Sequence, residues 1–223
     1  MRTEKSIVDT CMKYGISRYS INQDGSIDVD GNVNLSSNGL TVLPLQFGRV
    51  MGHFNIQDNF LSTLEGSPVG VGGNFNCYNN LLNNFLGGPK WIGGDFFAYN
   101  NKLTSLHGSA AEIVGSYYIS GNSCLANLMG CSVKIGGDFS FNDNLLSTYC
   151  GDDDIEYDGE FFLSETHYNR LNTRKLPMEI LQNLRHLKLI LKYQRYFYIW
   201  NDDFSFNREN FDILIEEIEE GLR

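Results

Sequence analysis

The sequence predicts a mainly β solenoid of about seven coils with α-helical caps, and three observations predict it. The stretch WIGGDFFAYNNKLTSLHGSA, residues 91–110, has a near-copy 21 residues earlier in VGVGGNFNCYNNLLNNFLGG. Apolar residues recur at that spacing along most of the chain, and an asparagine follows them at a fixed offset. With 223 residues, of which 42% are hydrophobic, the chain can bury a sizeable core by stacking such units.

Two apolar ladders define the coils. An aromatic or β-branched residue recurs at intervals of 21 and then 22 residues, at Val33, Phe54, Phe75, Phe96, Tyr117, Phe139 and Phe161. A second apolar residue follows two positions later, at Leu35, Ile56, Cys77, Ala98, Ile119, Phe141 and Leu163. Residues two apart in a strand point to the same side, so we expect each pair to point inward and pack on the neighbouring coils.

An asparagine ladder accompanies the apolar ladders, five positions after the first apolar residue. Its members are Asn38, Asn59, Asn80, Asn101, Asn122 and Asn144. We expect these side chains to turn inward and satisfy backbone amides and carbonyls at the bend, which would otherwise be buried without partners. The glycine pairs such as Gly72-Gly73 and Gly93-Gly94 predict either a positive φ or a close approach between coils.

The chain divides into three parts. Residues 1–30 form an N-terminal cap with a helix over residues 4–14 and a hairpin that turns at Asp24-Gly25. Residues 31–176 form the solenoid. Residues 177–223 form a C-terminal helical cap, with one helix from Met178 to about residue 198 and another over about residues 208–222.

The fifth coil, SYYISGNSCLANLMGCSVKI, matches the pattern least well. Cys124 stands where the other coils carry leucine, and one extra residue is inserted near Asn127. We therefore expect a local bulge in this coil.

The repeat string φ-x-φ-x-x-Asn-x-Leu-x-x-Leu resembles the leucine-rich repeat. The variant GGDFxxxxNxLTSLxG more narrowly resembles leucine-rich-repeat-like proteins encoded by bacteriophages and prophages. This resemblance implies a parallel β-sheet on the concave face of a curved solenoid. Because Gly commonly replaces the first Leu of the motif and the repeat is short, we expect extended or 3₁₀ segments on the convex side.

Composition and motifs exclude several functions. The net charge of −10 argues against a nucleic-acid binder, which needs a basic stripe. The sequence contains none of the common nucleophile, phosphate-loop or metalloprotease motifs, so we expect no enzymatic activity, no cofactor and no metal site. Five unpaired-looking cysteines, no signal peptide and no membrane-length apolar run predict a cytoplasmic protein, in the host bacterial cytoplasm if it is phage-encoded.

The outward strand positions carry the candidate site. Consecutive coils place there four aromatic residues, which we expect to form one exposed patch: Tyr78, Phe97, Tyr99 and Tyr118. Asp95, Asp138 and Asp143 would border it, and Phe162 would extend it. Trp200, in the aromatic segment 192–211, is a candidate anchor for partner docking or dimerisation. Two alternatives stay open: the aromatic ladder only stiffens the sheet, and the segment 192–211 only caps the last coil.

These features favour a non-enzymatic protein-binding module whose partner has a basic or Arg-rich surface. The resemblance implies a phage-encoded protein that acts on a host protein, for example by inhibiting a bacterial antiviral defence system. The concave aromatic face and the acidic C-terminal end would make the contact, since residues 152–223 carry 16 acidic and 9 basic groups. The alternatives are a structural or assembly component of a virus, self-associating through the C-terminal aromatic segment, and a protein that sequesters a small nucleotide signal.

Overall fold

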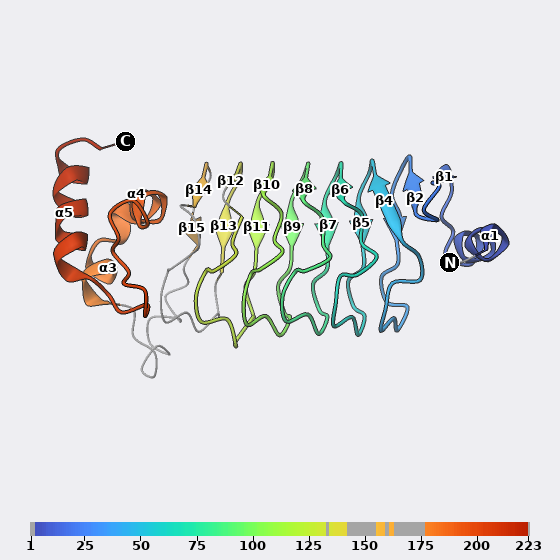
Figure 1. Cartoon of the computed structure of the whole chain (residues 1–223), viewed down its shortest axis with the longest axis horizontal. Helices are drawn as coiled ribbons and strands as arrows, with labels where there is room; N and C mark the ends of the chain where they lie inside the picture. Colours follow the sequence, from blue (N-terminus) through green and yellow to red (C-terminus); the bar gives the residue numbers. More distant parts are fainter. Residues whose placement is uncertain (1–2, 133, 142–154, 159–160, 163–176, 223) are drawn as a thin grey trace.

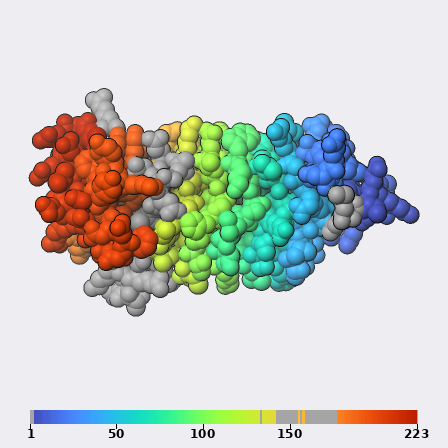
Figure 2. Space-filling view, viewed as in Figure 1, coloured from blue at the N-terminus to red at the C-terminus, as the bar shows by residue number. Residues whose placement is uncertain are grey.

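The chain folds as a β-solenoid closed by helices at both ends (Figure 1). The computed structural model describes residues 3–132, 134–141, 155–158, 161–162 and 177–222, and of residues 156, 161 and 162 only the backbone. Two sheets run along the long axis of the molecule (Figure 1). The space-filling view shows the same elongated outline (Figure 2). About five turns of the coil lie within the described residues, so the prediction of a mainly β solenoid is confirmed. The total of seven coils and the concave curvature stay predictions.

The seven-stranded sheet is the one that the apolar ladders predicted. Its strands follow one another in parallel, one coil apart, and are β3 (Val33–Asn34), β5 (Phe54–Asn55), β7 (Phe75–Asn76), β9 (Phe96–Phe97), β11 (Tyr117–Tyr118), β13 (Phe139–Ser140) and β15 (Phe161–Phe162). Both inward ladders are buried from Val33 to Phe141. The rings of the first ladder stack along the axis, with centroids 5.1 Å apart for Phe75 and Phe96 and 4.9 Å apart for Phe96 and Tyr117. The buried Tyr117 hydroxyl is 3.0 Å from Ser109 Oγ, which satisfies it.

A second sheet, parallel from β2 onward, lies on the other side of the coil, where the sequence predicted only extended or 3₁₀ segments. Its eight strands are β1 (Tyr19–Ile21), β2 (Ile27–Val29), β4 (Phe47–Val50), β6 (Gly70–Val71), β8 (Trp91–Ile92), β10 (Glu112–Ile113), β12 (Lys134–Ile135) and β14 (Glu156–Tyr157). A third buried ladder closes the core from this side, at Val50, Val71, Ile92, Ile113 and Ile135. The core is therefore a column between two sheets, because most coils bury an aromatic residue from the seven-stranded sheet and a β-branched residue from the eight-stranded sheet.

The asparagine ladder behaves as predicted in four coils. Asn59, Asn80, Asn101 and Asn122 are buried, and each side-chain amide donates to a carbonyl of the preceding coil and to carbonyls of its own. Asn38 differs: it is exposed, and its amide donates to Ser36 O at 2.8 Å. The first coil has no equivalent coil before it, so the inward partners are absent there. Asn144 lies outside the described residues.

The glycine pairs serve close approach between coils. A Cβ on Gly72 would lie 2.1 Å from Met51 O, and one on Gly93 would lie 2.5 Å from Gly72 O. Neither glycine has a positive φ. A side chain at these positions would thus collide with the backbone of the preceding coil, and steric room rather than backbone freedom explains the glycines.

The N-terminal cap contains the predicted helix and hairpin. Helix α1 (Glu4–Lys13) is capped at its N-terminus by Thr3, whose side chain accepts from Ser6 N at 3.3 Å. Ile7 and Cys11 are buried, whereas Met12 is exposed. Strands β1 and β2 pair antiparallel and cover the first coil of the eight-stranded sheet.

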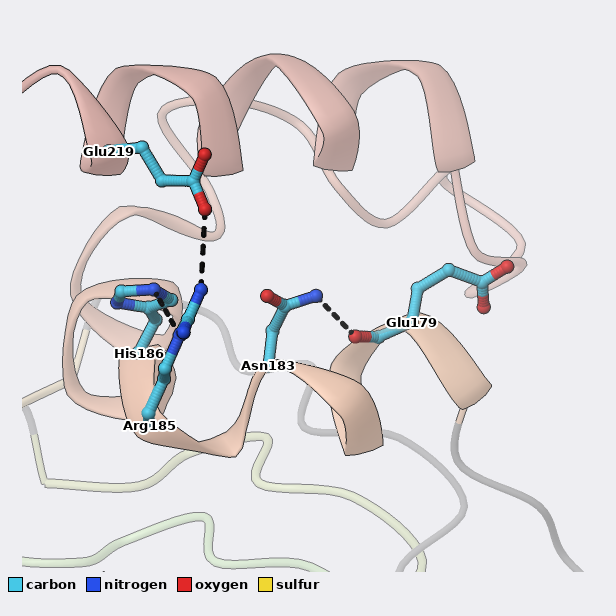
Figure 3. Close-up of polar contacts among 5 residues, drawn as sticks. All are labelled: Glu179, Asn183, Arg185, His186 and Glu219. Atoms are coloured by element: carbon cyan, nitrogen blue, oxygen red, sulfur yellow. Dashed lines mark hydrogen bonds and ion pairs between the residues drawn. The ribbon is translucent and has the colours of Figure 1, made fainter.

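The C-terminal cap differs from its prediction, because the single helix expected from Met178 to residue 198 is wrong. The segment forms α3 (Met178–Gln182), a 3₁₀ turn η2 (Leu184–His186) and α4 (Leu187–Tyr193). Asn183 ends α3, and its Nδ2 donates back to Glu179 O at 2.9 Å (Figure 3), a local hydrogen bond that competes with helix continuation. The cap packs on the solenoid end, where Ile155 N donates to Leu191 O at 3.1 Å.

The second predicted helix of this cap is present as α5 (Arg208–Glu219). Asn207 caps its first turn by accepting from Asn210 N at 3.1 Å. Arg185 of η2 reaches Glu219 of α5, with Nη2 and Oε1 3.3 Å apart (Figure 3). Among the described residues, none of the helices is long and apolar enough to cross a bilayer.

The irregularity in the fifth coil is present but lies earlier than predicted. Leu103 follows the inward Asn101 by two positions, whereas Leu125 follows Asn122 by three, and both leucines are buried. The extra residue is thus inserted between Asn122 and Leu125, and Leu125 N donates to Asn122 O at 2.9 Å. Cys124 consequently points to solvent and does not replace the core leucine.

Candidate protein-binding face

The outer face of the seven-stranded sheet carries the predicted aromatic residues. Phe97 and Tyr118 are aligned partners in β9 and β11. Their neighbours Phe96 and Tyr117 are buried, so alternation along the strand directs Phe97 and Tyr118 outward, and both are half-buried. The two rings stack with centroids 5.1 Å apart and planes inclined by 3°.

A second pair of rings continues the face two residues along the chain. The rings of Tyr78 and Tyr99 stack with centroids 4.3 Å apart and an interplanar angle of 12°. Phe97 meets Tyr99 edge to face at 6.5 Å, which joins the two pairs. All four side chains are half-buried. We call these four residues the aromatic face.

Polar side chains form one border of the aromatic face. Asp58 Oδ1 accepts from Asn79 Nδ2 at 2.8 Å, and Asn79 Oδ1 accepts from Asn100 Nδ2 at 3.1 Å. Burial raises the pKa of Tyr99 to about 12, and the adjacent Tyr78 and the Asp58 carboxylate add to the effect. The Tyr99 hydroxyl is therefore neutral over the physiological pH range and is available for hydrogen bonding.

The opposite border is a ladder of side chains that hydrogen-bond to the backbone of the next coil. Asn74 Oδ1 accepts from Asp95 N at 3.0 Å, Asp95 Oδ1 accepts from Ser116 N at 2.8 Å, and Ser116 Oγ accepts from Asp138 N at 2.9 Å. Asp95 and Asp138 are half-exposed. Asp95 thus has a structural role in the ladder and also places a carboxylate two residues before Phe97, on the same side of the strand.

Comparison with protein-family models, with curated proteins and with solved structures gave no match in any of the three. The function has therefore to be argued from the geometry of the chain itself.

The remaining predicted site residues do not all belong to this face. Phe162 lies in β15 and is aligned with Ser140, which follows Tyr118 in the row but is buried. The side chain of Phe162 is outside the described part of the chain, as is all of Asp143. Trp200 is in the C-terminal cap and is half-buried. Its Nε1 donates to Gln194 Oε1 at 3.1 Å and its ring packs on Phe206 at 5.4 Å. Trp200 thus takes part in the packing of the cap.

The sequence reasoning missed exposed apolar residues on the opposite side of the coil. Met51, Val69, Trp91 and Val114 lie on or beside the strands of the eight-stranded sheet and are exposed. The signal was present, because Met51, Trp91 and Val114 are adjacent in sequence to members of the third buried ladder and Val69 lies two positions before one. It was missed because that sheet was not predicted. Within the described residues, no group of three or more His, Cys, Asp or Glu side chains could hold a metal ion.

Proposed function

We propose that the chain is a non-enzymatic protein-binding module that contacts its partner through the aromatic face. The observation that supports this most directly is the contact of four half-exposed rings from three consecutive coils. Solubility disfavours such a cluster, and exposed aromatic clusters are typical of binding surfaces.

The chemistry of the borders favours a basic partner. Asp58 and Asp95 place carboxylates on two sides of the rings, and a guanidinium stacked on Tyr or Phe gains cation–π attraction. An arginine side chain can therefore lie on a ring while its N–H groups reach a carboxylate. Phosphate groups suit this face poorly, since acidic side chains border it.

The net charge of −10 adds long-range attraction for a basic partner. Residues 152–223 contribute −7 of that charge, so the acidic C-terminal end would steer the partner toward the solenoid. The proposed setting is that of a phage-encoded protein acting on a host protein, such as a component of antiviral defence.

Affinity purification from bacterial host cells tests the proposal. We expect native protein to retain a host protein that the Phe97→Ala and Tyr99→Ala variants lose, because each truncation of a central anchor weakens binding by about 2 kcal/mol or more. Phe60→Ala is the matched control, since Phe60 is 59% exposed and lies in a turn outside the aromatic face. Circular dichroism verifies that all variants fold.

A defined probe tests the chemistry of the partner. We expect an Arg-rich peptide to bind native protein with an affinity that falls with salt, and a Glu-rich peptide of equal length not to bind. Equal binding of the Arg-rich peptide to the native protein and to Tyr99→Ala would refute the aromatic face as the contact surface.

A further inference from the structure

The outer face of the eight-stranded sheet carries a row of side chains with an ordered pattern. The strand register aligns Arg49 with Gly70, Gly70 with Trp91, Trp91 with Glu112, and Glu112 with Lys134. The next residue in each strand, from Val50 to Ile135, is buried, so alternation directs the row outward. The row thus reads basic, glycine, tryptophan, acidic, basic, and within the chain the last two are paired, with Lys134 Nζ 2.6 Å from Glu112 Oε1.

Trp91 lies on this face and is partly exposed. A Cβ on Gly93 would lie 2.6 Å from Cη2 of the indole, so the ring lies against the Gly93 backbone. Trp91 is nevertheless 42% exposed, and Val69, Met51 and Val114 on the other coils of this sheet are 61%, 65% and 49% exposed. An exposed cluster of this kind favours a contact surface.

Gly70 is a glycine that the fold does not require. Its φ is not in the left-handed region, and the nearest atom to an added Cβ is Trp91 O at 4.0 Å. Gly72, two residues on, has no such room. Glycine weakens a strand, and it often marks a place where another molecule approaches closely. The missing side chain leaves a notch between Arg49 and Trp91, which are two strands or about 10 Å apart.

We propose that this face is a dimer interface between two copies of the chain. The two-fold axis runs parallel to the strands, midway between the coils of Gly70 and Trp91. It places the rows of the two copies face to face, with their residues in opposite order. The backbone of Trp91 in each copy then faces Gly70 of the other, and its indole, which lies over Gly93, reaches the flat glycine surface from Gly70 to Gly72. Arg49 of each copy meets Glu112 of the other, so that this carboxylate lies between Arg49 and its own Lys134. A two-fold contact requires such self-complementarity, and this row has it in both shape and charge.

The flanking positions continue the match. Asp28 lies at the register shift between β2 and β4, where its Oδ1 accepts from Arg49 N at 2.7 Å, and it would lie on the side of Lys134 of the second copy. Met51 would face Val114 of the second copy, which pairs two exposed apolar side chains. Both copies have the same spacing between coils, about 4.8 Å, so the pairs stay in step along the row.

The proposed contact is narrow, so we expect the affinity of the dimer to be low. Six positions span about 24 Å and one sheet face is only a few residues wide, so the interface is at the small end of specific interfaces. We therefore expect a reversible dimer that forms with rising protein concentration and weakens with salt.

Sedimentation velocity from about 1 µM to about 500 µM tests the proposal at low and high salt. The native chain should shift from monomer to dimer, and Gly70→Val should stay monomeric because it fills the notch while keeping the strand. Arg49→Glu and Glu112→Arg should each weaken the dimer, and the double variant should restore it. Phe97→Ala, on the other sheet, should associate like the native chain.

A native chain that is monomeric throughout would overturn the proposal. So would a dimer that Gly70→Val leaves unchanged, because the second copy would then contact another surface. If Gly70→Val fails to fold, the charge exchange between Arg49 and Glu112 decides alone, since rescue by the double variant requires that the two positions meet.

Discussion

The side-chain amide of Asn80 donates to Ile56 O of the preceding coil at 2.9 Å, which ties the two coils together at the bend. The same amide donates to Cys77 O at 3.1 Å, and Asn80 Oδ1 accepts from Leu61 N at 3.0 Å. One buried side chain thus satisfies backbone groups of two coils, which is the reason that asparagine recurs in the repeat.

Asn80→Ala should therefore lower the free energy of unfolding by about 1–3 kcal/mol, because it leaves buried backbone groups without partners. Asn38→Ala is the matched control and should change stability little, since Asn38 is exposed. Urea unfolding followed by circular dichroism measures both. Equal losses in the two variants would contradict the role given to the inward ladder.

Two glycines two residues apart should respond in opposite ways to alanine. Gly72→Ala should destabilise the fold strongly, because its Cβ would lie 2.1 Å from Met51 O. Gly70→Ala should be neutral or stabilising by about 0.5–1 kcal/mol, since the Cβ has room and the unfolded chain loses freedom. Thermal unfolding of the two variants compares them directly, and a larger loss for Gly70→Ala would show that the coil packing is wrong.

The raised pKa of Tyr99 makes stability depend on alkaline pH. The pKa of about 12 in the folded chain exceeds the ordinary value of 10.0. The folded state therefore holds this proton more tightly. The resulting contribution to the free energy of unfolding is fully present below pH 10 and is lost as the pH rises toward 12. The Tyr99→Phe variant should lack this part of the loss of stability at alkaline pH. The difference between the ultraviolet absorbance titrations of the native protein and Tyr99→Phe gives the titration of Tyr99, and a midpoint near pH 10 would exclude the assignment.

The register of the fifth coil can be tested by thiol labelling. Cys124 is exposed, whereas Cys77 is buried and burial raises the pKa of its thiol. A thiol reagent at neutral pH should modify Cys124 and leave Cys77 intact until the chain unfolds, because the thiolate is the reactive form. Peptide mapping by mass spectrometry identifies the modified residue. A protected Cys124 would place it in the core and would return the inserted residue to the position near Asn127.

The sequence predicted most of the seven-stranded sheet. Period-two pairs such as Phe96 and Ala98 identified its inward side, and the inward asparagines followed from the offset of five residues. These positions can be predicted from the sequence because packing on similar neighbours favours the same residue type in every coil.

The eight-stranded sheet was harder to predict, since each coil has one regular buried residue there and the outward position varies from Arg49 to Lys134. Without the sheet, Trp91 could not be placed beside Gly70 or Glu112. The break of the C-terminal helix at Asn183 was likewise hidden, because apolar residues continue at helical spacing across it. Local hydrogen bonding by Asn183, rather than the hydrophobic pattern, ends that helix.

Site-specific photo-crosslinking tests the proposed binding face most directly. A benzophenone amino acid replaces Tyr99, Phe60 or Trp91 in turn, and the protein is irradiated inside bacterial host cells. The account predicts a product with a host protein from position 99, none from position 60, and only a dimer of the chain itself from position 91. A host protein captured from position 60 or 91, with none from position 99, would contradict it.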